Sequence, residues 1–289
     1  MATLVGTAEK SKPLRVSFVV HRVVMILTGA FFCIWTLGPM YWIIVTSLKT
    51  DLEVARDHTL VPTAVTLANY HTILFTTNFL TYIKNSIEVA VVTTALSMVF
   101  GSAAAYAISR LHFNGRGAVA RAIVVSYLVP GSLLFISLFE VLTDLNLTDK
   151  LTGLMVVYLS FTLPFCTWLM TGYFRSIPVE LEEAALVDGC TRVRALINII
   201  LPLTLPALVV VTLFSFTQSW NEFLYALVFI SSDSNKTFTV GLIGLIQGDT
   251  LPYGLMMAAA TLGMIPPLIV YVISQRWVVS GLAAGSVKG

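Results

Sequence analysis

The chain has 289 residues, of which 57% are hydrophobic and only 11% are charged, and its mean hydropathy is +0.87. A soluble globular domain carries roughly 25% charged residues, so this composition excludes an ordinary soluble fold and predicts an integral membrane protein. The net charge of +2, without a basic run interleaved with aromatic residues, argues against a nucleic-acid partner.

Windows free of charged residues mark the predicted membrane spans, because a spanning helix needs about 20 mostly apolar residues. Six such windows follow one another: Val23–Leu48, Val89–Ser109, Ala122–Phe139, Leu151–Phe174, Ala195–Asn221 (continuing past Glu222 to Ser232) and Thr250–Gln275. The first is too long for the apolar part of a signal peptide, and no small-residue cleavage site follows it. The pattern predicts an all-α membrane protein, with tails at residues 1–22 and 276–289 around one membrane domain at 23–275.

The distribution of Lys and Arg predicts the orientation. With both termini in the cytoplasm, the inner side carries twelve of these residues and the outer side five, which is the bias expected of a plasma-membrane protein. The inner loops are then Leu111–Arg121 and Ser176–Arg194, and the outer loops are Lys49–Ile83, Asp144–Lys150 and Ser231–Leu251.

The second inner loop holds a short acidic helix, predicted for about residues 178–190. Pro178 suits a first helical turn, three glutamates follow near the positive end of the helix dipole, and Gly189 fits the position that closes a helix. Thr191 is placed to cap the next helix. Four residues are spaced to share one face of this helix: Leu181, Ala184, Ala185 and Asp188.

Two interpretations of this acidic helix are open. It is either a solvated connector or interfacial anchor, or a surface on which another protein docks. A helix that anchors to lipid carries Lys or Arg on its polar face, whereas this one carries Glu180, Glu182 and Glu183. The acidic face favours a basic protein partner.

The sequence contains none of the common motifs for nucleotide binding or catalysis. There is no G-x-x-x-x-G-K-[ST] phosphate loop, G-x-S-x-G elbow or H-E-x-x-H helix. Cys33, Cys166 and Cys190 lie too far apart in the sequence to predict a disulfide framework or a metal site. We therefore predict no catalytic residue, no metal site and no enzyme activity.

Polar residues gather towards the end of the fifth window, where they are costly and usually face a cavity or a neighbouring helix. The candidates for a substrate path are Gln218, Trp220, Asn221 and Glu222. An indole offers a flat face on which a sugar ring stacks, and the amide and carboxylate suit hydroxyl groups. A helix–helix contact or an outer gate explains the same residues equally well.

A longer pattern resembles a known family. Glu183-Ala184-Ala185 is followed after three residues by Gly189, and after nine more by Ile199-Ile200-Leu201-Pro202. This is similar to the EAA signature of the permease subunits of bacterial ABC importers, in the carbohydrate branch and closest in type to the shorter maltose-importer permease. Supporting stretches, in order, are "SLKT" at 47–50, "LVPG" at 128–131, "SIPVELEEAALVDG" at 176–189, "WNEFLYAL" at 220–227 and "GLAAGSVKG" at 281–289.

The resemblance implies a type I ABC importer permease fold, with six transmembrane helices and a cytoplasmic coupling helix. It implies that Glu183 pairs with a basic residue of a cytoplasmic ATPase dimer, which binds ATP and Mg²⁺, so that this chain holds no cofactor. It also implies a second permease, an extracytoplasmic sugar-binding protein reached by the loop Ser231–Leu251, and a bacterial inner membrane. The residues implied in coupling are Glu183, Ala184, Ala185, Asp188, Gly189, Leu201 and Pro202.

The alternative function is an ion-gradient-driven secondary transporter or a channel subunit. That class places ionisable groups or broken helices near the middle of the bilayer. The central turns of these windows carry almost no charge, which favours the importer subunit.

Overall fold

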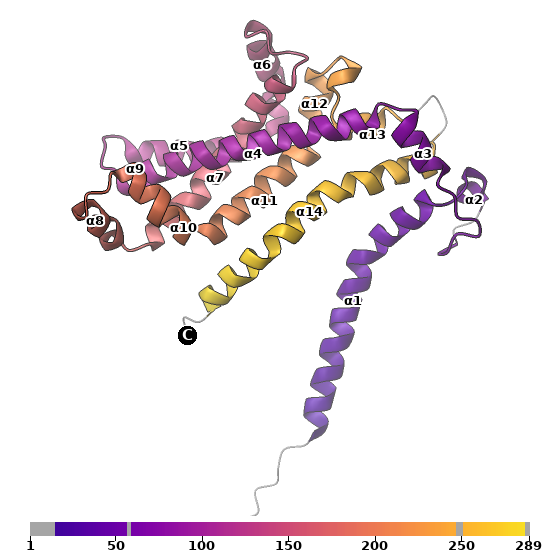
Figure 1. The fold of residues 1–289 in the computed structure, drawn as a ribbon, viewed down its shortest axis with the longest axis horizontal. Coiled ribbons are helices and arrows are strands. Elements are labelled where there is room, and N and C mark those ends of the chain that lie inside the picture. Colours follow the sequence, from indigo (N-terminus) through magenta and orange to yellow (C-terminus); the bar gives the residue numbers. More distant parts are fainter. Residues whose placement is uncertain (1–14, 57–58, 247–250, 287–289) are drawn as a thin grey trace, which may run out of the picture.

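The computed structural model describes residues 15–56, 59–246 and 251–286, and these ranges contain helices and no strands (Figure 1). In chain order the elements are α1 (Arg15–Ser47), α2 (Asp51–Arg56), α3 (Ala68–Phe75), α4 (Phe79–Arg110), α5 (Arg116–Leu128), α6 (Gly131–Asp144), α7 (Leu151–Ser176), α8 (Val179–Val187), α9 (Arg192–Ala195), the π-helical turn η1 (Leu196–Ile200), α10 (Leu201–Leu203), α11 (Leu205–Asn221), α12 (Leu224–Phe229), the 3-10 turn η2 (Asp233–Asn235), α13 (Phe238–Ile243) and α14 (Tyr253–Ser286).

Four helices are long and apolar enough to cross a membrane unbroken, namely α1, α4, α7 and α14. Two further spans are bent pairs, Arg116–Leu128 with Gly131–Asp144 at 103° and Arg192–Leu203 with Leu205–Asn221 at 83°. Each of the six predicted windows thus has a counterpart. The third and fifth windows correspond to the two bent pairs.

Proline causes both breaks. Proline donates no backbone hydrogen bond and keeps the residue before it out of the helical region. Val129 and Pro130 are extended, with ψ of 123° at each, and α6 begins directly after them. In the fifth span Pro202 and Pro206 flank the break at Thr204, whose hydroxyl donates to the carbonyl of Ile200 at 3.0 Å. Pro130, Pro202 and Pro206 thus lie where helices bend or begin.

Helix α4 lies at the centre of the bundle and packs along α7. Small and polar side chains let the two helices approach closely: Ser97 shares a hydrogen bond of 2.7 Å with Thr162, and a Cβ added at Gly101 would lie 2.4 Å from the Cys166 sulfur. Helix α4 also contributes to all three hydrophobic clusters, through Val89, Phe79 and Tyr106 among others. Side chains at both ends of α4 bind the neighbouring loops.

At the end of the bundle where α4 begins (the α3 end), the segment 231–238 is tied to α4. The Asn85 amide donates to the carbonyls of Ser234 and Lys236 at 2.8 and 2.9 Å, and the backbone N–H of Phe238 donates to the Ser86 hydroxyl at 2.8 Å. Within the predicted outer loop Ser231–Leu251, η2 and α13 give this segment regular structure. Residues 247–250 of the same predicted loop lie outside the described residues.

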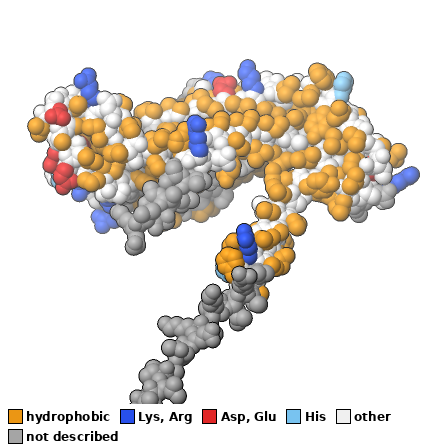
Figure 2. Space-filling model, turned by 60° about the horizontal axis from the view of Figure 1, so that its bottom comes forward, with side chains coloured by type: hydrophobic (Ala, Val, Ile, Leu, Met, Phe, Trp, Pro, Cys, Tyr) orange, Lys and Arg blue, Asp and Glu red, His pale blue; other side chains and the backbone are white. Residues whose placement is uncertain are grey.

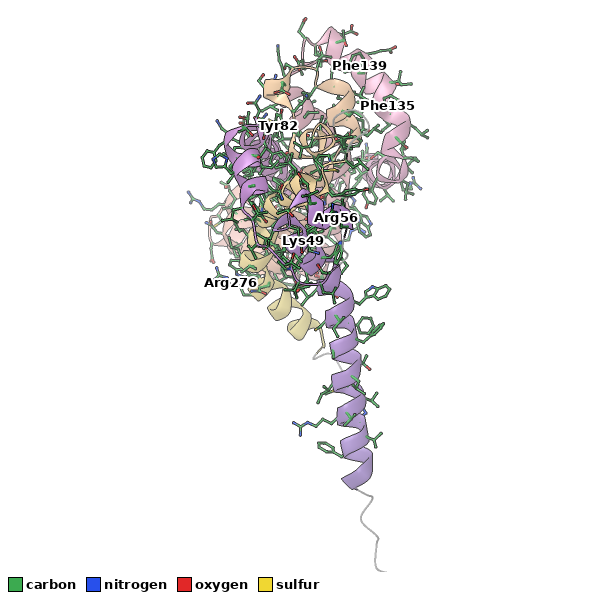
Figure 3. The ribbon with its side chains drawn as sticks, turned by 90° about the vertical axis from the view of Figure 1, so that its right-hand side faces the viewer. Lys49, Arg56, Tyr82, Phe135, Phe139 and Arg276 are labelled. Atoms are coloured by element: carbon green, nitrogen blue, oxygen red, sulfur yellow. The ribbon has the colours of Figure 1, made fainter. Side chains whose placement is uncertain are left out.

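Helix α1 runs away from the other helices, and none of its most apolar stretch is buried (Figures 1 and 3). In Figure 3, Phe135 and Phe139 project from α6 at the opposite end of the view. Hydrophobic side chains cover most of the face seen in Figure 2, as expected of a subunit surrounded by lipid and partner helices. Helix α14 continues past Gln275 to Ser286, so the predicted boundary at residue 276 does not mark a helix end.

Candidate functional site

The acidic helix forms where it is predicted, as α8, at the opposite end of the bundle (the α8 end). Pro178 stands at its N-cap, one position before the first turn, and Gly189 adopts the left-handed region with φ of 86°. The N–H of Cys190 donates to the Ala185 carbonyl at 2.9 Å and that of Gly189 to the Leu186 carbonyl at 3.1 Å. This pair of bonds is the Schellman closure that favours glycine, so the predicted role of Gly189 in ending the helix is confirmed.

The next helix also begins as predicted. The hydroxyl of Thr191 accepts the N–H of Arg194 at 3.3 Å and caps α9. Of the remaining coupling candidates, Leu201 packs against the cluster around Ile200 and Ala207. Pro202 is exposed and starts the bend of the fifth span. These two residues lie beyond α8 and shape the helix that follows it.

Burial divides α8 into two faces. Glu182 and Ala185 are buried, with 4% and 5% of their surface exposed. Glu183, Ala184 and Asp188 are exposed. The prediction that Ala185 shares an exposed face with Leu181, Ala184 and Asp188 is therefore wrong, because Ala185 packs into the chain's own body. The exposed face contains Leu181, Glu183, Ala184, Val187 and Asp188, and we call it the α8 face. Acidic side chains gather at this end of the molecule in Figure 2.

Glu182 is a functional candidate that the sequence reasoning missed. Its carboxylate lies 3.2 Å from Nε of Arg110 and accepts a hydrogen bond from the Tyr106 hydroxyl, and both partners come from the last turns of α4. Arg192 lies at 4.0 Å on the exposed side. The guanidinium of Arg110 also donates to the Ile177 carbonyl at 2.8 Å. The only signal in the sequence was Arg110 at the end of the second span, with Tyr106 one turn before it. This signal does not show which glutamate pairs with Arg110.

The second region of interest lies where the break of the third span meets the junction between α11 and α12. The Tyr225 hydroxyl, on α12, donates to the Gly131 carbonyl at 2.7 Å and so joins them. Beside this contact is a cavity of about 460 Å³. Residues that line it include Tyr127, Pro130, Phe161, Gln218, Asn221 and Tyr225.

The four substrate-path candidates occupy different environments. Trp220 is 2% exposed and stacks between Phe216 and Phe238, at centroid distances of 6.0 and 5.4 Å. Because the chain's own rings already cover this indole, the expectation that it stacks on a sugar is wrong. Gln218 and Asn221 are exposed, lie one turn apart on α11, and both line the cavity.

Glu222 closes the gap between α11 and α12. Its carboxylate accepts the N–H groups of Tyr225 and Ala226 at 2.9 and 3.1 Å and the hydroxyl of Tyr158 at 2.8 Å. A carboxylate at this position satisfies the free N–H groups of a helix start and interacts favourably with its dipole. Glu222 therefore holds the wall of the cavity, and the side chains free to meet a solute from α11 are Gln218 and Asn221.

Among the residues that the structure describes, no group of three or more His, Cys, Asp or Glu side chains is arranged to hold a metal ion. The cavity is lined by aromatic rings and amides, and the α8 face by acidic and small apolar residues. The first suits a neutral polar solute and the second suits a basic protein surface.

Comparison with known proteins identifies the family. Residues 97–283 match the family described as binding-protein-dependent transport system inner membrane component. The sulfoquinovosyl glycerol transport system permease protein SmoH of Agrobacterium fabrum is 38% identical, over 96% of this chain and 94% of that protein. The trehalose/maltose transport system permease protein MalG of Thermococcus litoralis is 36% identical, over 94% and 98%. The diacetylchitobiose uptake system permease protein DasC of Streptomyces coelicolor is 33% identical, over 91% and 96%.

A solved structure supports the fold. A chain from the crystal structure of a bacterial ABC transporter that imports the acidic polysaccharide alginate superposes with a TM-score of 0.77, at 24% identity, over 92% of this chain and 99% of that one. The predicted importer-permease fold is thereby confirmed, and so is the resemblance drawn from the EAA pattern. The chain belongs to the family of binding-protein-dependent transport system inner membrane components.

Proposed function

We propose that this chain is one of two permease subunits of an ATP-driven carbohydrate importer in a bacterial inner membrane. The names of three relatives support the substrate class, since they refer to sulfoquinovosyl glycerol, trehalose or maltose, and diacetylchitobiose. All of these compounds are sugars or sugar derivatives. An extracytoplasmic binding protein would deliver the sugar, in keeping with the family description.

The observation that carries the proposal is the α8 face. A helix whose first turn is anchored by Glu182 and Ala185 presents Glu183, Ala184 and Val187 outward. The small side chain of Ala184 lets a partner approach the backbone, and the carboxylate of Glu183 would accept hydrogen bonds from a basic residue. We assign this surface to a cytoplasmic ATPase, which binds ATP and Mg²⁺, and place both termini and the α8 end in the cytoplasm on the charge bias of the loops.

The cavity between the break of the third span and the α11–α12 junction is the proposed wall of the translocation path. Gln218 and Asn221 would exchange hydrogen bonds with sugar hydroxyls, and Tyr127 and Phe161 would contact the apolar faces of the rings. The second permease would complete the path. ATP binding would draw the two coupling helices together and open this path towards the binding protein, and hydrolysis would reset it.

The contribution of Glu183 to coupling can be compared with the free energy that the conformational change requires. To change the ratio of a transporter's two conformations from 1:99 to 99:1, a partner must bind one of them about 5.5 kcal/mol more tightly than the other. A hydrogen bond to a charged group contributes about 1.5–3 kcal/mol. Glu183 would therefore supply part of the coupling, and apolar contacts of Leu181 and Val187 would supply the rest.

The test is uptake and ATP hydrolysis by the complete importer reconstituted in liposomes. Glu183→Ala should lower the amount of sugar taken up per ATP by about tenfold, within the range of coupling between two sites, while the complex stays assembled. Glu140→Ala, at an exposed glutamate of α6, is the matched control and should keep the ratio. Undiminished uptake by Glu183→Ala would contradict the proposal.

The same preparation separates the alternative, a gradient-driven transporter. Collapsing the proton and sodium gradients with ionophores should leave uptake unchanged, whereas an inactive ATPase partner should abolish it. The reverse outcome would favour a secondary transporter.

A further inference from the structure

Two adjacent glutamates at the start of α8 have opposite environments. Glu183 is exposed, whereas the side chain of Glu182 is 5% exposed and faces an Arg110 side chain that is 6% exposed. A buried carboxylate is retained only when it is paired and hydrogen-bonded. The buried partners of Glu182 come from α4, and the more distant Arg192 of α9, at 4.0 Å, is exposed.

Three side chains form this attachment, and we call them the α4–α8 clamp: Tyr106, Arg110 and Glu182. Arg110 reaches Glu182 at 3.2 Å and also donates to the Ile177 carbonyl at 2.8 Å, so it holds both the first turn of α8 and the chain that enters it. Tyr106, one turn earlier on α4, donates to the same carboxylate. Because the clamp contacts α8 and the chain before it at several points, α8 cannot pivot about any one of these contacts.

The other end of α4 is attached in a comparable way. Tyr82 donates to Asp233 at 2.8 Å, Asn85 donates to two carbonyls of the segment 234–236, and Ser86 accepts the N–H of Phe238. Between the two attachments α4 is a helix without proline. Its 32 residues span about 48 Å at 1.5 Å per residue, which is enough to cross the hydrocarbon core.

We infer that Glu182 is a positioning residue that joins α8 and α4 into one rigid body, so that a displacement of α8 reaches the segment 231–238 at the opposite end of the bundle. This inference rests on the proposed coupling function and adds to it a route within the chain. Glu183 binds the partner, and Glu182 couples the resulting movement of α8 to α4. A hydrogen-bonded and ion-paired joint has a defined geometry, which is what a rigid joint requires.

The clamp excludes a simpler picture in which α8 is a passive connector. The loops on either side of α8, at Ile177–Pro178 and Asp188–Thr191, are short turns. Without the clamp, α8 would be attached mainly to α9 and η1 and through the buried Ala185, and it could move relative to α4. With it, α8 cannot move towards a partner without carrying the end of α4.

The experiment measures distances in the complete importer held in lipid nanodiscs. Spin labels replace Val179, which is exposed on α8 but does not belong to the α8 face, and Thr81, which is exposed at the far end of α4. With the clamp intact, the distance between the two labels should have the same distribution in the nucleotide-free and the vanadate-trapped states, because both labels belong to one rigid body. Glu182→Gln, which removes the ion pair but keeps an acceptor for Tyr106, should shift and broaden the distribution on trapping and lower uptake per ATP by about tenfold.

Glu140→Gln, at an exposed glutamate of α6, is the matched control and should behave as wild type. If Glu182→Gln leaves both the distances and the uptake ratio unchanged while Glu183→Ala uncouples, the clamp is refuted and the proposed function stands. If Glu183→Ala also has no effect, the proposed function itself fails. Should Glu182→Gln not assemble, Tyr106→Phe removes one hydroxyl only. It should broaden the distribution in the same direction, and a distribution identical to wild type would overturn the inference.

Discussion

The two ends of α4 each hold a loop through a carboxylate, but in different surroundings. At the α8 end, Glu182 and Arg110 are almost fully buried, with side-chain exposures of 5% and 6%. At the α3 end, Asp233 and Lys236 form a pair at 2.8 Å with exposures of 50% and 29%. A buried pair costs several kcal/mol when one partner is removed, whereas an exposed pair contributes at most about 1 kcal/mol. Asp233 and Lys236 both belong to the loop, so their pair does not attach it to α4. The attachment at the α3 end consists of hydrogen bonds made by Tyr82, Asn85 and Ser86, whereas a buried ion pair attaches α8.

Close packing replaces the ion pair at the α3 end. A Cβ at Gly241 would lie 2.1 Å from the Tyr82 ring, and one at Gly263 would lie 2.0 Å from the Phe238 ring. Phe238 in turn contacts Phe79 and Trp220, at centroid distances of 5.8 and 5.4 Å. Mutations that add volume should therefore affect the α3 end, and mutations that change charge should affect the α8 end.

The largest effect is expected from Glu182→Leu. It leaves Arg110 buried without its counter-ion, so the free energy of unfolding in detergent should fall by about 3–5 kcal/mol. The double variant Glu182→Leu/Arg110→Met should recover most of this loss, since an apolar pair of similar volume replaces the charges. Equal stability of the single and double variants would show that the ion pair is not the main interaction of Glu182.

The next effect is predicted at the α3 end, for Gly241→Ala. The added methyl group overlaps the Tyr82 ring and forces side chains or backbone to shift, which costs about 1–3 kcal/mol. Gly172→Ala, where an added Cβ meets nothing within 4 Å, is the control and should be neutral or slightly stabilising. Thermal unfolding of the two purified variants compares them, and equal midpoints would contradict the packing argument.

A smaller change is expected for Gly189→Ala, which tests the closure of α8. An added Cβ there meets nothing within 4 Å, so the cost is that of a non-glycine residue at φ of 86°, about 1–2 kcal/mol. Gly189→Asn should cost less, because asparagine tolerates this region. If both variants are as stable as wild type, the left-handed closure is not required.

The smallest effect is predicted for Asp233→Asn. Hydrogen bonds from Lys236, Asn78 and Tyr82 lower the pKa of Asp233 to about 2. Because the folded pKa lies below the ordinary value of 3.8, the stabilisation is fully present above about pH 4 and is lost as the pH falls towards 2. Uptake should therefore be independent of this group between pH 5 and 8, and Asp233→Asn should cost at most about 1 kcal/mol. A loss as large as that of Glu182→Leu would contradict the contrast between the two ends.

Local signals in the sequence predicted the parts of the structure that local forces determine. The four unbroken spans follow from charge-free length, and the ends of α8 follow from Pro178, Gly189 and Thr191. The prolines indicated that the third and fifth spans are interrupted. Their bends of 103° and 83° depend on packing between helices, which composition does not encode.

The roles of individual polar residues depended on distant parts of the chain. Glu182 and Glu183 are adjacent, and only the position of Arg110, more than seventy residues earlier, decides which one is buried. Trp220 is covered by Phe238, and Glu222 caps a helix that the sequence presented as a continuation of the fifth span. Sequence reasoning therefore located the two regions and misassigned several side chains within them.

The most direct test of the central claim, that α8 seats on a cytoplasmic ATPase, is a photo-cross-link from its exposed face in native membranes. A benzoylphenylalanine replacing Val187, the most exposed large apolar residue of α8 among those described, should cross-link to the ATPase subunit, and nucleotide should change the yield. Products that contain only lipid, or no product at all in membranes that carry the assembled importer, would contradict the account.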